Sequence, residues 1–203
     1  MITIIDYGMG NLGSVVNMLR RIEVDCEVTA DSSRIADASR ILLPGVGAFD
    51  AAMDRIHSAG LREVLDYKAL HQRVPILGIC LGMQLLTRRS EEGTRDGLGW
   101  ISAETRRLPQ TSDLKIPHMG WNVAERTRQC PLTDRLDSEI RFYFVHSYCV
   151  HTDKPQDTVL RTNYGVDFAS AVQSDNIMGA QFHPEKSHRF GMQLLRNFAD
   201  LPC

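Results

Sequence analysis

Apolar and polar positions follow two different periods over the first 90 or so residues. Short apolar runs occur at residues 2–5, 41–43 and 74–79, and a weaker strand begins at residues 27–28. Between them, apolar side chains recur at helical spacing over residues 12–19, 51–56, 61–70 and 82–89. Strands that are apolar on both faces and separated by helices predict a parallel sheet covered by helices on both sides.

The pattern changes after Gly93, where helical spacing gives way to short strand-like runs. These runs occupy residues 116–123, 140–150, 158–161, 168–172 and 177–182. Their spacing predicts an antiparallel extension of the same sheet, closed by a helix over residues 191–198. We therefore expect an α/β fold, a three-layer sandwich with a mixed, mainly parallel sheet, in one domain over residues 1–203.

Composition and charge narrow the possible roles. The 203 residues carry 23 Lys and Arg against 25 Asp and Glu, so no basic face for a nucleic acid or an acidic membrane is expected. No apolar run approaches the roughly 20 residues that cross a bilayer, and the N-terminus lacks the features of a signal peptide. Five scattered cysteines without a C-x-x-C pair argue against a disulfide framework or a zinc ribbon. We expect a soluble cytoplasmic protein without a metal or cofactor.

The sequence Gly78-Ile-Cys80-Leu-Gly82 has the form of a nucleophile elbow with Cys in place of Ser. Its two glycines leave room for a sharp turn between a strand and a helix, which would hold the Cys80 sulfur clear of the sheet. The N-terminus of that helix favours a thiolate, and the N–H of Leu81 is placed to receive an oxyanion. A buried structural cysteine is the alternative, which this motif alone leaves open.

His183 and Glu185 are the candidates for the base and its orienting group. His183 follows the apolar run at residues 177–182, so it would emerge at a strand end, and Pro184 fixes the backbone after it. A thiolate nucleophile needs such a base within reach. An isolated His-x-Glu is more often a loop histidine beside a solvated acid. Together with an elbow cysteine in an α/β chain, it predicts a triad of Cys80, His183 and Glu185.

A second oxyanion donor is expected from the strand end at Leu43-Pro-Gly-Val-Gly47. The glycines let the backbone N–H groups of Val46 and Gly47 approach a ligand closely. A plain turn after the third strand would explain the same residues.

Five motifs together carry a resemblance to a known family. They are Pro44-Gly-Val-Gly47, Gly78-Ile-Cys-Leu-Gly-Met-Gln84, Pro117-His-Met-Gly-Trp-Asn122, Tyr143-Phe-Val-His-Ser-Tyr148 and Gln181-Phe-His-Pro-Glu-Lys-Ser187. This set resembles the class I (triad) glutamine amidotransferases and, within them, the HisH subfamily, the glutaminase subunits of imidazole glycerol phosphate synthase. The resemblance implies that Cys80 attacks the side-chain amide of glutamine while His183, oriented by Glu185, moves the protons. By position it also implies four glutamine-binding residues, Gln84, Glu92, Ser147 and Tyr148.

The same resemblance implies a partner. Ammonia would pass to a (β/α)8 cyclase subunit, HisF, which forms imidazole glycerol phosphate and an aminoimidazole carboxamide ribotide (AICAR) in histidine biosynthesis. The residues that match partner-facing motifs are Asn11, His118, Trp121 and Lys186. A core aromatic is the ordinary alternative for Trp121, and a solvated charge for Lys186.

A second partner fits the same chemistry. A HisH-like paralogue would supply ammonia to a sugar amidotransferase in surface-polysaccharide biosynthesis, and residues 141–144 and 183–191 resemble that branch at least as well. The triad and the glutamine chemistry are the same in both branches, so the sequence leaves the acceptor of the ammonia open.

Interpretations from other classes of protein compete with this one. Gly8-Met-Gly10-Asn-Leu-Gly13 fits the dinucleotide fingerprint G-x-G-x-x-G, with Asp31 downstream, which is typical of an NAD-dependent oxidoreductase. A tight glycine turn that lets a helix pack close to the sheet explains the same residues. A binding protein with a vestigial triad is a further possibility, against which the intact triad argues. A free-standing cysteine hydrolase would leave the glutamine-reading segments unexplained.

Overall fold

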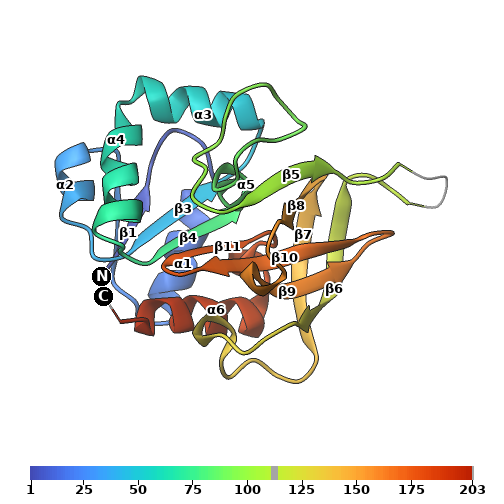
Figure 1. The fold of residues 1–203 in the computed structure, drawn as a ribbon. Coiled ribbons are helices and arrows are strands. Elements are labelled where there is room, and N and C mark those ends of the chain that lie inside the picture. The colour runs from blue at the N-terminus through green and yellow to red at the C-terminus, as the bar shows by residue number, and fades with distance from the viewer. Residues whose placement is uncertain (111–113, 203) are drawn as a thin grey trace.

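A computed structural model describes residues 1–110 and 114–202 of the chain, so Cys203 lies outside the described residues. Within this part, eleven strands form one sheet in the order β2-β1-β3-β4-β11-β10-β9-β6-β7, with β8 paired to β10 and β5 paired to β8 (Figure 1). The strands are β1 (Ile2–Ile5), β2 (Cys26–Thr29), β3 (Ile41–Gly45), β4 (Ile76–Cys80), β5 (Ala103–Arg107), β6 (His118–Arg126), β7 (Ile140–His146), β8 (Tyr148–Thr152), β9 (Thr158–Asn163), β10 (Asp167–Ser174) and β11 (Ile177–Ala180).

The sheet has a parallel part and an antiparallel part. Strands β2, β1, β3, β4 and β11 pair in parallel, and all other pairs are antiparallel. The α/β fold with a mixed sheet is confirmed. The strands β5 to β10 after Gly93 pair antiparallel, as predicted, but the run predicted at residues 177–182 does not belong wholly to that extension, because β11 pairs in parallel with β4 on one side and antiparallel with β10 on the other. The antiparallel part is larger than a mainly parallel sheet would give, because every strand from β5 to β10 belongs to it.

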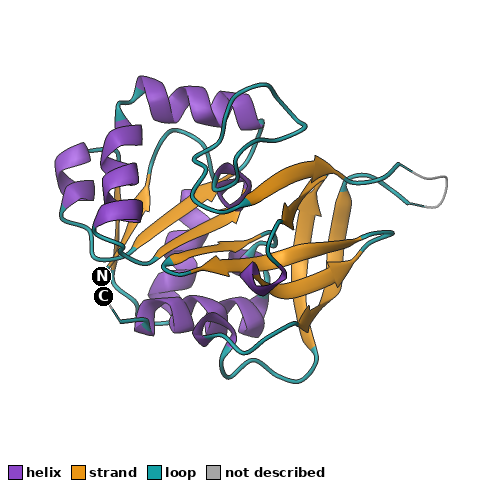
Figure 2. Ribbon diagram, viewed as in Figure 1, coloured by secondary structure: helices purple, strands orange, loops and turns teal. Residues whose placement is uncertain are grey.

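Helices cover both faces of the parallel part (Figure 2). They are α1 (Leu12–Arg21), α2 (Ser32–Ala36), α3 (Phe49–Ser58), α4 (Leu61–Asp66), α5 (Leu81–Leu85) and α6 (His188–Asp200), with a π-helical turn at Tyr67–His71 after α4 and short 3₁₀ turns at Pro131–Thr133, Pro155–Asp157 and Pro184–Lys186. Helices α1 and α6 bury their apolar stripes in one core, through residues such as Leu19 and Leu195. Helices α3 and α4 bury theirs in a second core on the opposite face, through Phe49 and Leu61. This gives the expected three layers.

Several boundaries differ from the sequence prediction for physical reasons. Strand β3 continues through Pro44, because its pairing with β1 ends at Leu42 and only β4 lies beside the proline. Helix α5 has five residues and not the eight predicted, because the chain after Leu86 makes its backbone hydrogen bonds with β5, as from Arg88 to Ala103. The run predicted at residues 140–150 is broken at Ser147 into β7 and β8.

Helix α2 and strand β5 are absent from the sequence prediction.

The four described cysteines are unpaired. In the described part of the chain, no helix combines the length and the apolar character that a bilayer crossing requires.

Candidate active site

Cys80 lies on a sharp strand-to-helix turn, as the elbow motif predicts. It is the last residue of β4, and α5 begins at the next residue. Its backbone has φ +55°, a left-handed value that a non-glycine residue rarely adopts. A Cβ on Gly82 would collide with the carbonyl oxygen of Leu43, so only glycine lets α5 start this close to β3. The buried-cysteine alternative does not account for this geometry.

The end of β3 lies directly beside the elbow. Gly45 is opposite Cys80 in the parallel ladder, which places Val46 and Gly47 at the mouth of the turn. The Tyr7 hydroxyl donates a hydrogen bond of 2.9 Å to the Pro44 carbonyl and holds this strand end from the other side. The segment predicted to supply the second oxyanion donor is therefore next to the nucleophile.

His183 and Glu185 form a buried pair. Nδ1 of His183 lies 2.7 Å from Oε1 of Glu185, and both side chains are almost fully buried. The backbone N–H of His183 donates to the Tyr143 carbonyl at 2.9 Å, so the turn after β11 is fixed against β7. Nε2 of His183 makes no well-formed hydrogen bond within the described residues, which leaves this nitrogen available to a substrate.

The surroundings of His183 favour its protonated form beside the nucleophile. Burial by itself would lower the pKa of His183, but its interactions with the nearby Cys80 and Glu185 side chains outweigh burial and raise it above its ordinary value. An imidazolium at this position stabilises a thiolate on Cys80. The Cys80 sulfur also lies 3.8 Å from the Val145 carbonyl oxygen and 4.0 Å from Nε2 of Gln181.

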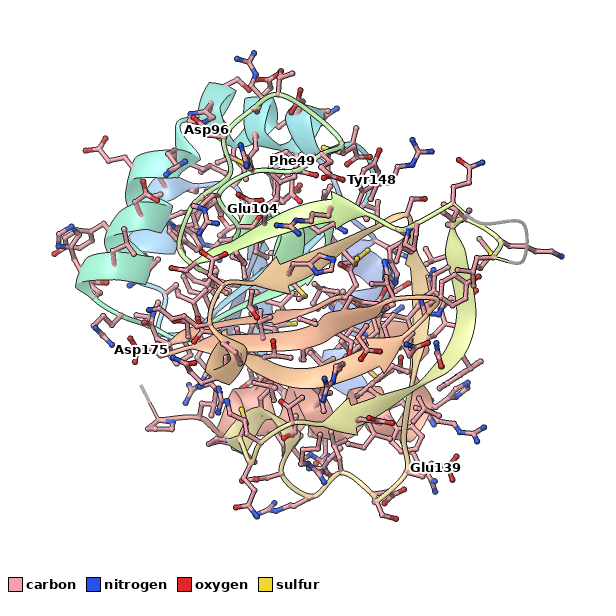
Figure 3. All side chains as sticks on the ribbon, turned by 45° about the vertical axis from the view of Figure 1, so that its right-hand side comes forward. Phe49, Asp96, Glu104, Glu139, Tyr148 and Asp175 are labelled. Carbon is pink, nitrogen blue, oxygen red and sulfur yellow. The ribbon has the colours of Figure 1, made fainter. Side chains whose placement is uncertain are left out.

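A cavity of about 280 Å³ opens at the elbow. Nearly all of the predicted catalytic, oxyanion and substrate-binding residues line it, with Glu185 behind His183: Val46, Gly47, Cys80, Leu81, Gln84, Glu92, Ser147, Tyr148 and His183. This volume is near the lower end of the range for small-molecule sites, which suits a substrate of amino-acid size. Figure 3 labels Tyr148, which lines the cavity, and Phe49, whose backbone N–H meets Glu92.

Two of the predicted substrate-binding residues have defined neighbours. Nε2 of Gln84 donates to the Tyr148 carbonyl at 3.0 Å and to Oε1 of Gln181 at 3.2 Å. Oε2 of Glu92 accepts a hydrogen bond of 2.9 Å from the Phe49 backbone N–H. Burial raises the pKa of the Glu92 carboxyl, and the nearby charge of Asp50 acts in the same direction. A cationic amino group would offset both effects.

Three residues at the site were not singled out from the sequence. Gln181 lies between Gln84 and the Cys80 sulfur. The Ser187 hydroxyl donates to the His183 carbonyl at 2.7 Å and accepts from the Tyr143 N–H at 3.0 Å, which fixes the turn that carries the triad. His146 lines the cavity, and its Nδ1 lies 2.8 Å from the Tyr148 carbonyl. Gln181, Ser187 and His146 belong to the resemblance motifs, but only the folded chain gives them partners.

The residues matched to partner-facing motifs are not equally accessible. Trp121 is 46% exposed on β6, and Lys186 is exposed with its Nζ 5.8 Å from the centre of the Tyr143 ring. Asn11 is exposed and caps α1 by accepting from the Ser14 N–H. His118 is 3% exposed, because its ring is stacked between Phe144 and Tyr164. Its side chain therefore offers almost no surface to a partner, which corrects its assignment as a contact residue.

The glycine-rich turn before α1 lacks one feature of a dinucleotide site. A Cβ on Gly13 would meet no atom within 4 Å, so close packing of helix on strand does not require glycine there.

Among the described residues, no group of three or more His, Cys, Asp or Glu side chains is placed to hold a metal ion.

Comparisons with known proteins agree with this geometry. The family model described as "Glutamine amidotransferase class-I" matches residues 3–201. The imidazole glycerol phosphate synthase subunit HisH 2 of Methanococcus maripaludis is 49% identical, covering 98% of both chains. The protein of that name from Pseudomonas aeruginosa is 47% identical, over 99% of this chain and 100% of its own. The structure of PurLQS from Thermotoga maritima contains a chain with the same fold, with a TM-score of 0.70 at 19% identity over 97% of this chain and 96% of its own.

Proposed function

The chain belongs to the class I glutamine amidotransferase family, and from that premise we propose that it is the glutaminase subunit of imidazole glycerol phosphate synthase. In this role it hydrolyses glutamine to glutamate and ammonia and passes the ammonia to a cyclase subunit, HisF, for histidine biosynthesis. The observation that carries the proposal is the cavity that joins Cys80 on its strained turn with His183 and with Gln84 and Glu92.

The first half-reaction releases ammonia. The Cys80 thiolate attacks the side-chain amide carbon of glutamine, a C–S bond forms, and negative charge develops on the amide oxygen. The N–H of Leu81 and the Val46–Gly47 segment stabilise that charge. The C–N bond then breaks as the His183 imidazolium gives its Nε2 proton to the departing nitrogen.

The second half-reaction regenerates the thiolate. Neutral His183 takes a proton from water, and the resulting hydroxide attacks the thioester carbon. A second oxyanion forms at the same donors and collapses to glutamate and the Cys80 thiolate. Glu185 keeps a hydrogen bond to Nδ1 throughout, so the reactive nitrogen is always Nε2.

An exposed apolar face on strand β6 supports the proposal that a partner protein covers the cavity. Met119, Trp121 and Val123 follow one another on one side of β6 and are 62%, 46% and 39% exposed. Met119 also lines the cavity, so a protein docked on this face would lie next to the released ammonia. Asn11 and Lys186 extend the proposed interface with polar groups. The proposed compartment is the cytoplasm, which the unpaired thiols favour.

The test is glutamate release from glutamine by the purified chain, measured alone and with the cyclase HisF together with its ribonucleotide ligand. Strong stimulation by the cyclase is the expected result. Slow Cys80-dependent hydrolysis without stimulation would retain the glutaminase and move the acceptor to a sugar amidotransferase. An absence of glutamate release in both mixtures would overturn the proposal.

A further inference from the structure

Glu92 is carried by a loop, residues 90–99, that two helices hold in place. At the start of this loop, the Glu92 N–H donates to the Ser90 hydroxyl oxygen at 3.1 Å. At its end, the Arg62 guanidinium on α4 donates to the carbonyls of Gly97 and Leu98 at 3.3 and 3.1 Å. Figure 3 labels Phe49 at the start of α3 and Asp96 on the loop.

The middle of the loop is bound by one carboxylate, that of Asp50 in the first turn of α3. Asp50 accepts hydrogen bonds from the Thr94 N–H at 3.0 and 3.1 Å and from the Arg95 N–H at 3.0 Å. The Thr94 hydroxyl adds a third donor at 3.3 Å. These backbone hydrogen bonds lower the pKa of Asp50, so the carboxylate is ionised at neutral pH. A Cβ on Gly93 would collide with the Asp50 carboxylate, which shows how closely loop and helix approach.

Glu92 makes the reciprocal contact. The residue that precedes α3, Ala48, has no side chain that can cap the helix, and Oε2 of Glu92 accepts from the Phe49 N–H in its place. Phe49 lies two residues after Gly47, which belongs to the proposed oxyanion segment. One carboxylate therefore touches both the start of α3 and the substrate cavity.

We propose that Asp50 is a positioning residue for glutamine: it clamps the loop to α3 so that Glu92 is held where the substrate's amino group binds. This inference rests on the proposed function. Asp50 does not line the cavity, so its effect reaches the substrate only through Glu92. Without the hydrogen bonds to Asp50, the two ends of the loop remain attached but its middle does not. The Glu92 carboxylate is then no longer fixed in the cavity.

Asp54 supplies a matched control. It lies one turn further along α3, and within residues 1–110 and 114–202 its carboxylate pairs with the exposed Arg95 side chain alone, at 2.9 Å. Replacing either aspartate with alanine removes one negative charge from the same helix near the same loop residue. Only Asp50→Ala removes the backbone hydrogen bonds.

The experiment compares two reagents that alkylate Cys80 in the full-length chain. One is 6-diazo-5-oxo-L-norleucine, which carries the amino-acid end of glutamine, and the other is iodoacetamide, which lacks it. We expect Asp50→Ala to slow labelling by the glutamine analogue about tenfold at low reagent concentration, the loss typical of hydrogen bonds to a charged group. Labelling by iodoacetamide should stay within about twofold of the wild type, and Asp50→Asn, which keeps one acceptor, should lie in between.

Each other outcome decides against the proposal. Equal analogue labelling in Asp50→Ala and Asp54→Ala would show that the clamp does not position Glu92. Equal slowing with both reagents would indicate a general structural effect of Asp50. A wild-type chain that the analogue does not label at Cys80 would instead overturn the proposed function, and this inference with it. If Asp50→Ala does not fold, the same comparison is made between Asp50→Asn and Asp54→Asn.

Discussion

The two walls of the site cavity are built by different kinds of contact. The elbow wall consists of Val46, Gly47, Cys80 and Leu81, at the ends of the parallel strands β3 and β4. The aromatic wall consists of Pro117, Met119, Val145, His146 and Tyr148, on and beside the antiparallel strands β6, β7 and β8. The first is held by backbone packed on backbone, whereas the second depends on hydrogen bonds of the His146 side chain, to His118 and to the Tyr148 carbonyl.

Backbone packing leaves the elbow wall no freedom to adapt. A Cβ on Gly78 would lie 2.6 Å from the Gly82 carbonyl oxygen, and a Cβ on Gly82 would meet the Leu43 carbonyl. A flexible side chain could move away from such a contact, but a strand backbone inside a sheet cannot. The position of the nucleophile is therefore set by the fold itself.

In the aromatic wall, the position of each proton matters. Because the Tyr148 carbonyl can only accept, Nδ1 of His146 must carry a proton, and its Nε2 must accept from Nδ1 of His118 at 3.0 Å. Nε2 of His118 then accepts from the Asn122 amide at 3.2 Å. This chain of hydrogen bonds requires both histidines to be neutral. Close backbone packing therefore fixes the elbow wall, whereas the aromatic wall can respond to the protonation state of its histidines and to a docked partner.

Removing the nucleophile tests the elbow wall most directly. Cys80→Ala should lower glutamine hydrolysis at least about 10,000-fold, because neither the base nor the oxyanion donors can form the thioester without sulfur. Glutamate release is the measurement, and Cys26→Ala on the edge strand β2 is the control for loss of a thiol. The partner's reaction with added ammonia should remain. Glutamine-dependent activity that persists in Cys80→Ala would overturn the assignment.

A single added methyl group should break the same wall without touching the chemistry. Gly82→Ala is expected to lower the free energy of unfolding by about 3 kcal/mol, because the new Cβ displaces backbone that cannot move. In a chain of this size, that loss lowers the unfolding temperature by about 10 °C. Gly13→Ala on α1, where a Cβ meets nothing within 4 Å, should be neutral or slightly stabilising. Equal unfolding temperatures for the two variants would contradict the account of the elbow.

The same difference explains what the sequence could predict. The elbow was predictable because Gly78, Cys80 and Gly82 lie within five consecutive residues, and the spacing that creates the steric demand is visible in the motif. The same holds for His183 and Glu185, which are two residues apart. Most contacts of His146, Ser187 and Asp50 join segments more than 25 residues apart; the exceptions are the contact of His146 with Tyr148 and that of Ser187 with His183. No local pattern reports such contacts.

The two missed elements have comparable causes. Strand β5 buries only alternate residues, and its outward positions are the charged Glu104 and Arg106, so it carries no apolar run. Helix α2 has five residues and buries one of them, Ile35, which is too little for a helical period. His118 was assigned to the partner surface from its motif, but the strand alternation on β6 turns it inward and leaves Met119 outside.

Acid should weaken the aromatic wall. Burial lowers the pKa of His118 to about 4 and that of His146 to about 3, against about 6.5 in the unfolded chain. As the pH falls below about 6.5, the unfolded chain takes up protons that the folded chain excludes, so the free energy of unfolding decreases. The raised pKa of His183 keeps it protonated in the folded chain, whereas the unfolded chain completes its own protonation of this residue between pH 7 and pH 5, so His183 offsets a small part of the loss. We expect a loss of about 2 kcal/mol between pH 7 and pH 5, measured by urea unfolding.

A variant can assign this pH dependence to the histidine pair. His118→Phe keeps a ring between Phe144 and Tyr164 but removes a titrating group, so the loss between pH 7 and pH 5 should fall by about half. His57→Phe removes an exposed histidine from α3 and should leave the loss unchanged. An unaltered pH dependence in His118→Phe would show that other groups cause it.

The smallest effect on the isolated chain is expected at the outer face of the aromatic wall. The Trp121 ring stacks on His188 at 5.5 Å and meets the edge of Tyr143 at 6.2 Å, but nearly half of it is exposed, so Trp121→Ala should cost the isolated chain no more than about 1 kcal/mol. Its effect should appear in the complex, because an exposed aromatic on an apolar strand is the kind of residue that anchors an interface. We expect affinity for the cyclase to fall at least about tenfold in titration calorimetry, with basal glutamate release unchanged. Tyr67→Ala removes a similarly exposed aromatic from the π-helical turn after α4 and should leave that affinity unchanged. Equal affinities for wild type and Trp121→Ala would place the partner on another face of the molecule.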